Sequence, residues 1–326
     1  MATRRNIELG LLASLLCTLL ISFSIIMRSP VPCPSQESAD GSFDQDENGV
    51  GGGAHRLAVI VPFRDRFDEL LQFAPHMHKF LNAQRIQHRF LIVNQVDRLR
   101  FNRGSLINVG FLVAQSDCDY LVMHDVDLLP LNRELSYAYP ANGGPMHLAA
   151  PDLHPRYHYP TFVGGILLMS NARFRQLNGL SNKYWGWGLE DDEFYARMRD
   201  ARLNVSRPGG LKTGIRNTFR HVHDKQHRPR DTARLHNQRA ETRRRDRVTG
   251  IRNTFRHVHD KQHRPRDTAR LHNQRAETRR RDRVTGLADV KYDLVALHRL
   301  VIDGAPVEVL DVRLRCNLTV TPWCQK

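Results

Sequence analysis

The chain has 326 residues, 40% of them hydrophobic and 25% charged, which is enough for one sizeable domain with a real core or for two small ones. Its formal net charge is +15, but residues 215–250 recur letter for letter as residues 251–286, and each copy holds ten Arg and one Lys against four acids. A chain with one copy would carry only +8, so half of the basicity is a duplication, which disfavours a nucleic-acid binder built on arginine runs. Two units are also too few for a solenoid, which needs about three.

The duplication has two explanations. Old repeats drift, so 36 identical positions indicate either a very recent duplication or an error in assembling the gene model, and we favour the error. In both cases the spare copy is expected to be a surplus basic insertion, looped out on the surface.

The N-terminal region is predicted to be a membrane anchor. Residues 9–27 form a run of 19 residues without a charge, close to the roughly 20 that a spanning helix needs. Arg4 and Arg5 precede the run and no small-residue cleavage site follows it at once, which favours a retained anchor over a removed signal peptide or a buried core helix. The predicted organisation is a cytosolic tail (1–8), a transmembrane signal anchor (9–27), a flexible stem (28–54) and one luminal domain (55–326).

The cysteines agree with a luminal domain. Cys316 and Cys324 are close in sequence and are the natural disulfide pair in an oxidising compartment. Cys118 stands alone beside an apolar run and is predicted to be a buried thiol. The N-x-S/T motif occurs at Asn204 and Asn317, where a luminal domain could be glycosylated.

Beyond the stem, apolar runs of strand length alternate with segments of helical periodicity. In chain order the expected strands are 57–63, 89–96, 120–130 and 164–170, and the expected helices are 67–81, 105–115 and 191–203, the first of them kinked or split by Pro75. This alternation indicates an α/β fold with a mainly parallel sheet covered on both faces. Ligands of such sheets gather at the carboxyl ends of the strands, where this chain has PFRDR, NQVD, HDVD and, further on, FRHVHD.

Two of these segments could bind a metal ion. Asp125 and Asp127 of HDVD are two apart, so in extended backbone both carboxylates would face one cation or diphosphate; loop acids that cap the next element are the alternative. His221 and His223 of FRHVHD are also two apart, and imidazoles together with a carboxylate fit Mn²⁺ better than Mg²⁺. Two surface histidines in a basic segment are the simpler interpretation of the second motif.

The most unusual stretch is YWGWGLEDDEF. Trp185 and Trp187 alternate with glycine, which suits a mobile flap with exposed indoles better than a core. Glu190, Asp191 and Asp192 follow at a predicted helix start, where a capping role would explain one of the three acids. Three acids beside indoles indicate instead a polar pocket for an acceptor sugar, with a base in it.

Taken in order, the motifs PFRDR, FNR, HDVDLLPLN, TFVGG, WGWGLEDDEF and FRHVHD make the chain resemble the β-1,4-galactosyltransferase family. The resemblance covers residues 57 to about 230 and resumes near 290 through the terminal TPWC. The HxH of FRHVHD points to the family member that acts on xylose.

The resemblance implies a Rossmann-like GT-A glycosyltransferase fold. It also implies an inverting, Mn²⁺-dependent transfer of galactose from UDP-galactose to the 4-hydroxyl of xylose on proteoglycan core proteins. The expected location is the Golgi membrane, with a single-pass type II topology and a luminal catalytic domain. No nucleic-acid partner is expected.

The resemblance also assigns roles to matching positions. Asp191 would be the catalytic base, and Asp127 would bind the metal with His221 and His223. The donor-binding positions are Pro62, Phe63, Arg64, Asp65, Arg66, Phe101, Asn102, Arg103, Val126, Asp127 and Arg230. The acceptor-binding positions are Tyr157, Trp187, Leu189, Glu190, Asp191 and Asp192.

Two alternatives stay open at this point. His257 and His259 of the second copy could bind the metal in place of the first pair, although the distance from EDD to the first copy is the one that matches the family. A metal-dependent phosphoester or nucleotide-sugar hydrolase is the alternative function, because clustered Asp and His also suit phosphoesters. It leaves the tryptophans and the acidic triplet without a role.

Overall fold

The computed structural model describes residues 55–211, 213–222, 282 and 284–325. The predicted cytosolic tail, anchor and stem lie outside these ranges and stay predictions. Within the described ranges no helix is both long and apolar enough to cross a membrane.

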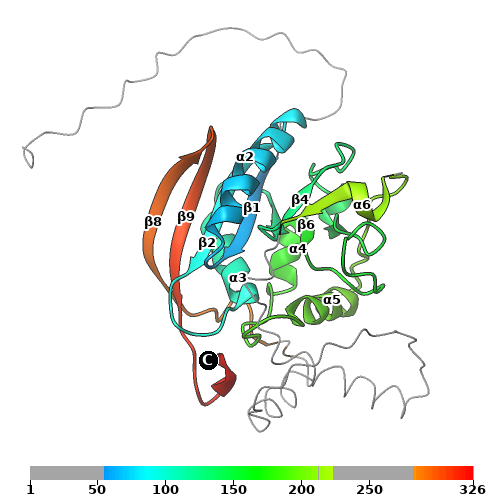
Figure 1. Ribbon diagram of the computed structural model, residues 1–326. Coiled ribbons are helices and arrows are strands. Elements are labelled where there is room, and N and C mark those ends of the chain that lie inside the picture. The colour runs from blue at the N-terminus through cyan, green and yellow to red at the C-terminus, as the bar shows by residue number, and fades with distance from the viewer. Residues whose placement is uncertain (1–54, 212, 223–281, 283, 326) are drawn as a thin grey trace, which may run out of the picture. The chain divides into compact units, whose positions relative to one another are not determined.

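A seven-stranded mixed sheet forms the centre of the described domain (Figure 1). Its strands, in sheet order, are β5 (Met146–His147), β6 (Ile166–Ser170), β3 (Tyr120–His124), β1 (Arg56–Phe63), β2 (Gln87–Gln95), β9 (Ala305–Leu314) and β8 (Tyr292–Ile302). The four central strands β3, β1, β2 and β9 run parallel, whereas β5, β6 and β8 pair antiparallel at the edges. The sequence predicts a mainly parallel sheet, and the sheet is parallel at its centre with antiparallel strands at both edges.

Helices cover both faces of the sheet, as the sequence predicts. Alternate residues of β1 point to opposite faces, because side chains along a strand have a period of two. Leu57, Val59 and Val61 pack in one buried cluster with α2 (Phe67–Ala83). Ala58 and Ile60 belong to the other cluster, with residues of α3 (Arg103–Ala114), α4 (Asn171–Gln176) and α5 (Glu190–Asp200).

The sequence predicts a kink or a split of α2 at Pro75, and the helix is not split there. Proline removes one backbone hydrogen bond from a helix interior and clashes with the preceding turn. The apolar face of α2 outweighs this cost, since Phe73, Ala74 and Met77 on either side of the proline are fully buried. Packing, rather than local propensity, decides the length of this helix.

The apolar run expected as one strand over 120–130 forms two strands. The strand β3 ends at His124, a turn follows at 125–127, and β4 (Leu128–Pro130) pairs antiparallel with β7 (Phe219–His221) in a separate two-stranded sheet. A short helix, α6 (Gly214–Thr218), leads directly into β7. The HDVD motif is thus a turn between two sheets, and the HxH motif begins beside it.

The C-terminal segment packs into the buried cluster on the side of the sheet that α3 covers. Cys316 and Cys324 form the predicted disulfide, and η2 (Pro322–Cys324) buries Trp323 in the same cluster as α3. Cys118 is a buried free thiol, as expected. The remaining short helix is η1 (Ala141–Gly143).

The described residues of the repeat come from the head of one copy and the tail of the other. Residues 215–222 of the first copy supply most of α6 and all of β7, and Asp282, Thr285 and Gly286 of the second copy contact the loop before α5. Residues 223–281 between them lie outside the described ranges.

Candidate active site

Asp127 and His221 face each other where the two sheets meet. The register of β4 against β7 places Leu128 opposite His221, and the Val222 amide donates to the Asp127 carbonyl at 2.8 Å. These contacts bring His221 Nε2 to 3.5 Å from Asp127 Oδ2, with both side chains largely buried. The strand end and the first histidine motif therefore converge, which is the arrangement that the sequence predicts for a metal site.

The rest of the predicted metal site cannot be described in the same way. His223, His257, His259 and Arg230 lie outside the described residues. Within the described ranges no group of three or more metal-ligating side chains occurs, so the structure supplies one carboxylate and one imidazole. Such a mixed oxygen and nitrogen pair fits Mn²⁺.

The HDVD motif lies in a turn at 125–127 rather than in extended backbone, so the spacing argument for its two carboxylates does not apply to it. Asp125 Oδ1 forms an ion pair with Arg103, 2.9 Å from Nη2 and 3.0 Å from Nε. Arg103 Nη1 also lies 3.7 Å from Glu190 Oε1 at the start of α5. Arg103 therefore bridges the end of β3 and the acidic helix, a role that the donor-binding assignment did not include.

The first turn of α5 concentrates negative charge in a buried place. Glu190 is 7% exposed, and its Oε2 has no hydrogen-bond partner among the described residues. Desolvation and the neighbouring Asp191 charge raise the pKa of both Glu190 and Asp192. A buried carboxylate oxygen without a partner is costly, so this one fits a polar ligand group.

Asp191 lies at the centre of the acidic turn. Desolvation raises the pKa of its carboxyl, while the Arg103 charge opposes that rise. A Cβ atom built on Gly164 would stand 2.8 Å from Asp191 Oδ2 and 2.7 Å from the Phe162 ring. Glycine is therefore required for this close approach, and the TFVGG motif shapes the wall behind the carboxylate.

The tryptophan segment differs from the predicted mobile flap. Trp185 is 3% exposed and belongs to the α3-side core, and only Trp187 is half-exposed. The Gly186 amide donates to the Phe101 carbonyl at 2.7 Å, which ties the segment to FNR. Left-handed backbone at Gly186, Gly188 and Leu189 (φ 94°, 97° and 78°) turns the chain sharply before α5.

The PFRDR and FNR motifs have structural contacts of their own. The Arg64 guanidinium donates to the Gln95, Asp97 and Leu99 carbonyls at 2.7–3.1 Å and lies 5.9 Å from the Phe101 ring centroid. The buried Asn102 side chain caps α3 by accepting from the Ser105 amide at 2.9 Å. Pro62 and Phe63 are buried at the end of β1, Arg66 pairs with Glu69, and Val126 is buried in the turn. Asp65 has left-handed backbone with φ 51°.

The segment from Pro151 to Phe162, called the acceptor loop below, faces the acidic turn. The Tyr157 ring lies 6.2 Å from the Trp187 ring at 37°, and Tyr159 hydrogen-bonds to Asp192. The buried rings of His154 and Phe162 pack behind Tyr157. The sequence analysis missed Tyr159, Phe162 and His154, because this loop has no periodicity; its density of rings before TFVGG is the signal that could have found them.

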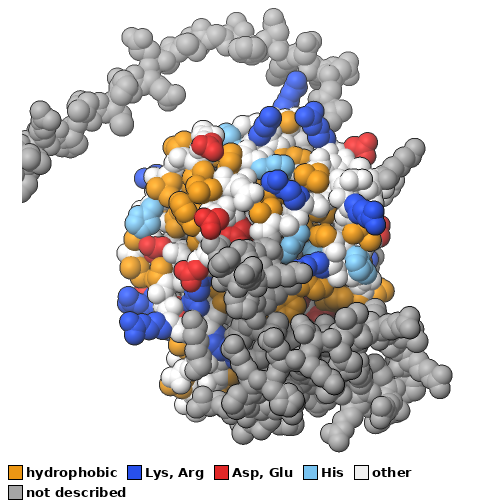
Figure 2. Space-filling model, viewed as in Figure 1, with side chains coloured by type: hydrophobic (Ala, Val, Ile, Leu, Met, Phe, Trp, Pro, Cys, Tyr) orange, Lys and Arg blue, Asp and Glu red, His pale blue; other side chains and the backbone are white. Residues whose placement is uncertain are grey.

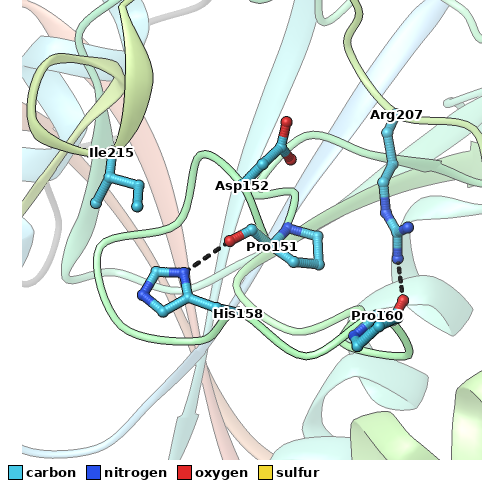
Figure 3. A pocket seen from close by; sticks show the side chains of 6 residues that line it. All are labelled: Pro151, Asp152, His158, Pro160, Arg207 and Ile215. Carbon is cyan, nitrogen blue, oxygen red and sulfur yellow. Dashed lines mark hydrogen bonds between the residues drawn. The ribbon is translucent and has the colours of Figure 1, made fainter.

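The outer side of the acceptor loop borders an open cavity of about 540 Å³ (Figure 3). His158 Nδ1 is 2.7 Å from the Pro151 carbonyl, and Arg207 Nη2 donates to the Pro160 carbonyl at 2.6 Å. The two contacts fasten the loop near its ends. The cavity lining is Pro151, Asp152, His158, Pro160, Arg207 and Ile215.

Comparison with known proteins shows the family of the chain. A family model described as the N-terminal region of glycosyl transferase group 7 matches residues 48–140, and one described as the N-terminal domain of galactosyltransferase matches residues 144–222. Beta-1,4-galactosyltransferase 7 of Drosophila melanogaster is 49% identical over 274 residues, which cover 84% of this chain and 74% of the relative. The chain belongs to the β-1,4-galactosyltransferase family.

Other relatives narrow the comparison within the family. Xylosylprotein 4-beta-galactosyltransferase of Caenorhabditis elegans is 45% identical, with 83% of this chain and 82% of the relative covered. A crystal structure of a point mutant of the Drosophila protein, in complex with manganese, UDP-Gal and xylobiose, is similar with a TM-score of 0.69 and 48% identity, covering 83% of this chain and 99% of that chain. The fold is therefore a GT-A-like glycosyltransferase fold, and the chain is a glycosyltransferase. The hydrolase alternative finds no support among these relatives.

Proposed function

We propose that this protein transfers galactose from UDP-galactose to the 4-hydroxyl of xylose on proteoglycan core proteins, with Mn²⁺ and with inversion at the anomeric carbon. The observation that carries the proposal is that the Asp127–His221 pair and the Asp191 carboxylate belong to one site, linked through Asp125, Arg103 and Glu190. A donor-binding side and an acceptor-binding side thus lie at the same end of the parallel sheet.

The metal-binding role falls to Asp127 and His221, joined by His223 of the same motif. Manganese bound there would supply a positive charge that stabilises the negative charge developing on the departing UDP. The first copy of the repeat is the one assigned to this role, because its His221 already lies 3.5 Å from Asp127. His257 and His259 of the second copy are then surplus.

The acceptor sugar would lie against the acidic turn. Tyr157 and Trp187 present rings on which a sugar ring can stack, and Leu189 contributes an apolar side chain beside them. The unpartnered Oε2 of Glu190 can accept from a sugar hydroxyl, and Asp192 can accept from another. This pairing of aromatic rings with buried carboxylates gives a sugar both contact area and fixed hydrogen bonds.

Asp191 is the base of the proposed reaction. The 4-hydroxyl oxygen of xylose attacks the anomeric carbon from the face opposite UDP, the bond from that carbon to the phosphate oxygen breaks, and the hydroxyl proton passes to Asp191. A raised pKa strengthens a carboxylate as a proton acceptor, and the Arg103 charge opposes the rise that desolvation causes. Burial of the site limits competing attack by water.

The donor would occupy the other side of the site. Phe101 and Val126 border it, and Arg66 and Arg103 present positive charge there, while Arg64 acts by holding the loop at 95–101. Pro62, Phe63, Asp65 and Asn102 shape the backbone of this side, and Arg230 is the proposed diphosphate-side arginine. We further propose a Golgi location with a single N-terminal anchor at 9–27 and a luminal catalytic domain.

The proposal is tested by a radiolabelled transfer assay with UDP-galactose and Mn²⁺, comparing a β-xyloside with an N-acetylglucosaminide. Transfer to the xyloside alone is expected, with loss of activity when the metal is chelated. An Asp191→Asn variant should keep donor binding and lose transfer by about 10²- to 10⁴-fold, as expected for removal of a general base. Equal transfer to both acceptors would remove the xylose assignment, and release of galactose without acceptor would restore the hydrolase.

A further inference from the structure

His154 organises the backbone of the acceptor loop. Its imidazole is 3% exposed, and its Nδ1 accepts from the backbone amides of Arg156 and Tyr157, both at 3.0 Å. An atom that accepts two N–H groups carries no proton, so the ring is neutral with its proton on Nε2. Burial lowers the pKa of His154 to about 3, which keeps the ring in this form.

The His154 side chain makes the kind of backbone contact that Asn or Asp makes in an Asx-turn. Asn and Asp often bond with their side-chain oxygen to amides two and three residues further on, which fixes a tight turn. Here the histidine does so across Pro155, which has no amide proton of its own. The direction in which the chain leaves His154, and with it the place of Tyr157, is therefore set by one ring nitrogen.

The same ring also packs against the aromatic side chains of the loop. Its centroid lies 5.0 Å from that of Tyr157 and 5.1 Å from that of Phe162. Tyr157 in turn lies 5.0 Å from Phe162 and 6.2 Å from Trp187. His154 thus belongs to a cluster of rings that extends through Tyr157 to Trp187, where the acceptor sugar is proposed to bind.

We propose that His154 is a positioning residue for the acceptor sugar: it fixes Tyr157 opposite Trp187 and itself touches neither reactant. The inference rests on the proposed acceptor role of Tyr157. The contacts of His158 and Arg207 are made to the Pro151 and Pro160 carbonyls (Figure 3), whereas His154 holds the backbone between them, at Arg156 and Tyr157.

Two substitutions separate the ring nitrogen from the ring itself. His154→Asn keeps an acceptor at nearly the same position and removes the ring, whereas His154→Phe keeps a ring and removes the acceptor. In steady-state transfer to a β-xyloside, His154→Phe should raise the KM for the xyloside about tenfold, the effect of one lost buried hydrogen bond. The KM for UDP-galactose should stay within about twofold, and His154→Asn should recover most of the xyloside affinity.

Hydrogen exchange gives a readout that does not depend on turnover. The amides of Arg156 and Tyr157 should exchange faster in His154→Phe than in the wild type, and should stay protected in His154→Asn. His298→Phe on the exposed strand β8 is the matched control and should change neither quantity.

The outcomes separate the two proposals. A wild type that does not transfer to the xyloside would refute the proposed function, while the exchange rates would still decide whether His154 fixes the loop. Wild-type KM and wild-type exchange in a folded His154→Phe would overturn the inference. If His154→Phe does not fold, His154→Gln, whose acceptor lies one carbon further out, replaces it, and wild-type behaviour there would overturn the inference equally.

Discussion

Arg103 is the only cation for which the structure shows ion pairs to both the HDVD turn and the acidic turn of α5, among the residues described. Its distance from Asp125 is that of a direct ion pair, and its charge lowers the pKa of Asp191 against the effect of desolvation. The positive charge of Arg103 thereby partly offsets the negative charge of the Asp125, Glu190 and Asp191 carboxylates. We therefore expect Arg103 to contribute to the proposed reaction through its charge.

Replacing Arg103 should change the pH dependence of the reaction. Without the positive charge the pKa of Asp191 rises further, and a base with a higher pKa is protonated up to a higher pH. In Arg103→Met the acidic limb of kcat/KM should therefore move to higher pH by about one unit or more, whereas Arg103→Lys should move it less. The measurement is kcat/KM for a β-xyloside between about pH 5 and pH 9, and an unshifted limb in a folded variant would contradict this account.

Sequence reasoning named the residues that belong to compact motifs, Arg103 among them, but not the contacts that act across the chain. Asp127, His221 and the acidic triplet stand in short patterns at strand ends or helix starts, so their positions followed from the fold class. Arg103 reaches a residue 22 positions away, and His154 acts through its ring nitrogen on a loop without periodicity. Neither contact leaves a trace in hydrophobic patterning.

At the scale of elements, the buried side of α5 contacts the end of the second copy of the repeat. Arg197 is 6% exposed, pairs with Glu193 at 2.7 Å, and donates to the carbonyls of Gly179 at 3.0 Å and Thr285 at 2.8 Å. It also donates to the Asp282 carbonyl. One side chain thus links α5, the loop after α4 and the segment that leads to β8.

Removing this guanidinium should destabilise the fold. Arg197→Met leaves the Glu193 carboxylate and several carbonyls without their donor, which typically costs about 3 kcal/mol for a broken buried pair. Desolvation already raises the pKa of Glu193 to about 7, so protonation of this carboxyl reduces the cost at acid pH. Urea unfolding at pH 8 compares the variant with Arg199→Met, whose side chain is 53% exposed and should change the free energy of unfolding by less than about 0.5 kcal/mol. Equal stability of the two variants would contradict this role.

The elements themselves were predictable where packing and periodicity agree. The strands β1, β2 and β6 and the helices α2, α3 and α5 fall close to the expected ranges, whereas β3 begins where expected and ends six residues early. The pairing of β4 with β7 was not predictable, because it joins three-residue strands about ninety positions apart. At Pro75 the opposite holds, since the buried face of α2 keeps the helix from splitting despite a strong local signal.

At the scale of the whole molecule, the repeat determines the charge. On the face shown in Figure 2, basic and acidic side chains are interspersed. Each copy of the repeat contributes +7 to the net charge of +15. The described parts of the repeat are the start of the first copy and the end of the second. A single copy would supply both parts.

Deleting residues 223–258 tests whether one copy of the repeat is sufficient. The deletion joins Val222 to His259 and leaves the sequence of one copy intact. The β4–β7 pairing and the Asp282 contacts should persist. The shorter connection lowers the entropic cost of closing the loop by roughly 0.8 kcal/mol. Transfer to the xyloside should be retained and the thermal midpoint should not fall, while the salt needed for elution from heparin should drop. Loss of transfer in the deleted form would show that the additional copy is part of the working enzyme.

The disulfide-bonded C-terminal segment contacts the residues just before two of the site motifs, WGWGLEDDEF and FNR. Trp323 donates to the Lys183 carbonyl just before the tryptophan segment, and the Cys324 carbonyl accepts from Arg100 just before FNR. Breaking the Cys316–Cys324 bond would free the support that these two motifs have in common. Chains made in a reducing cytosol should therefore fold with a loosened tryptophan segment, and recombinant production of active protein should require secretion or oxidative refolding.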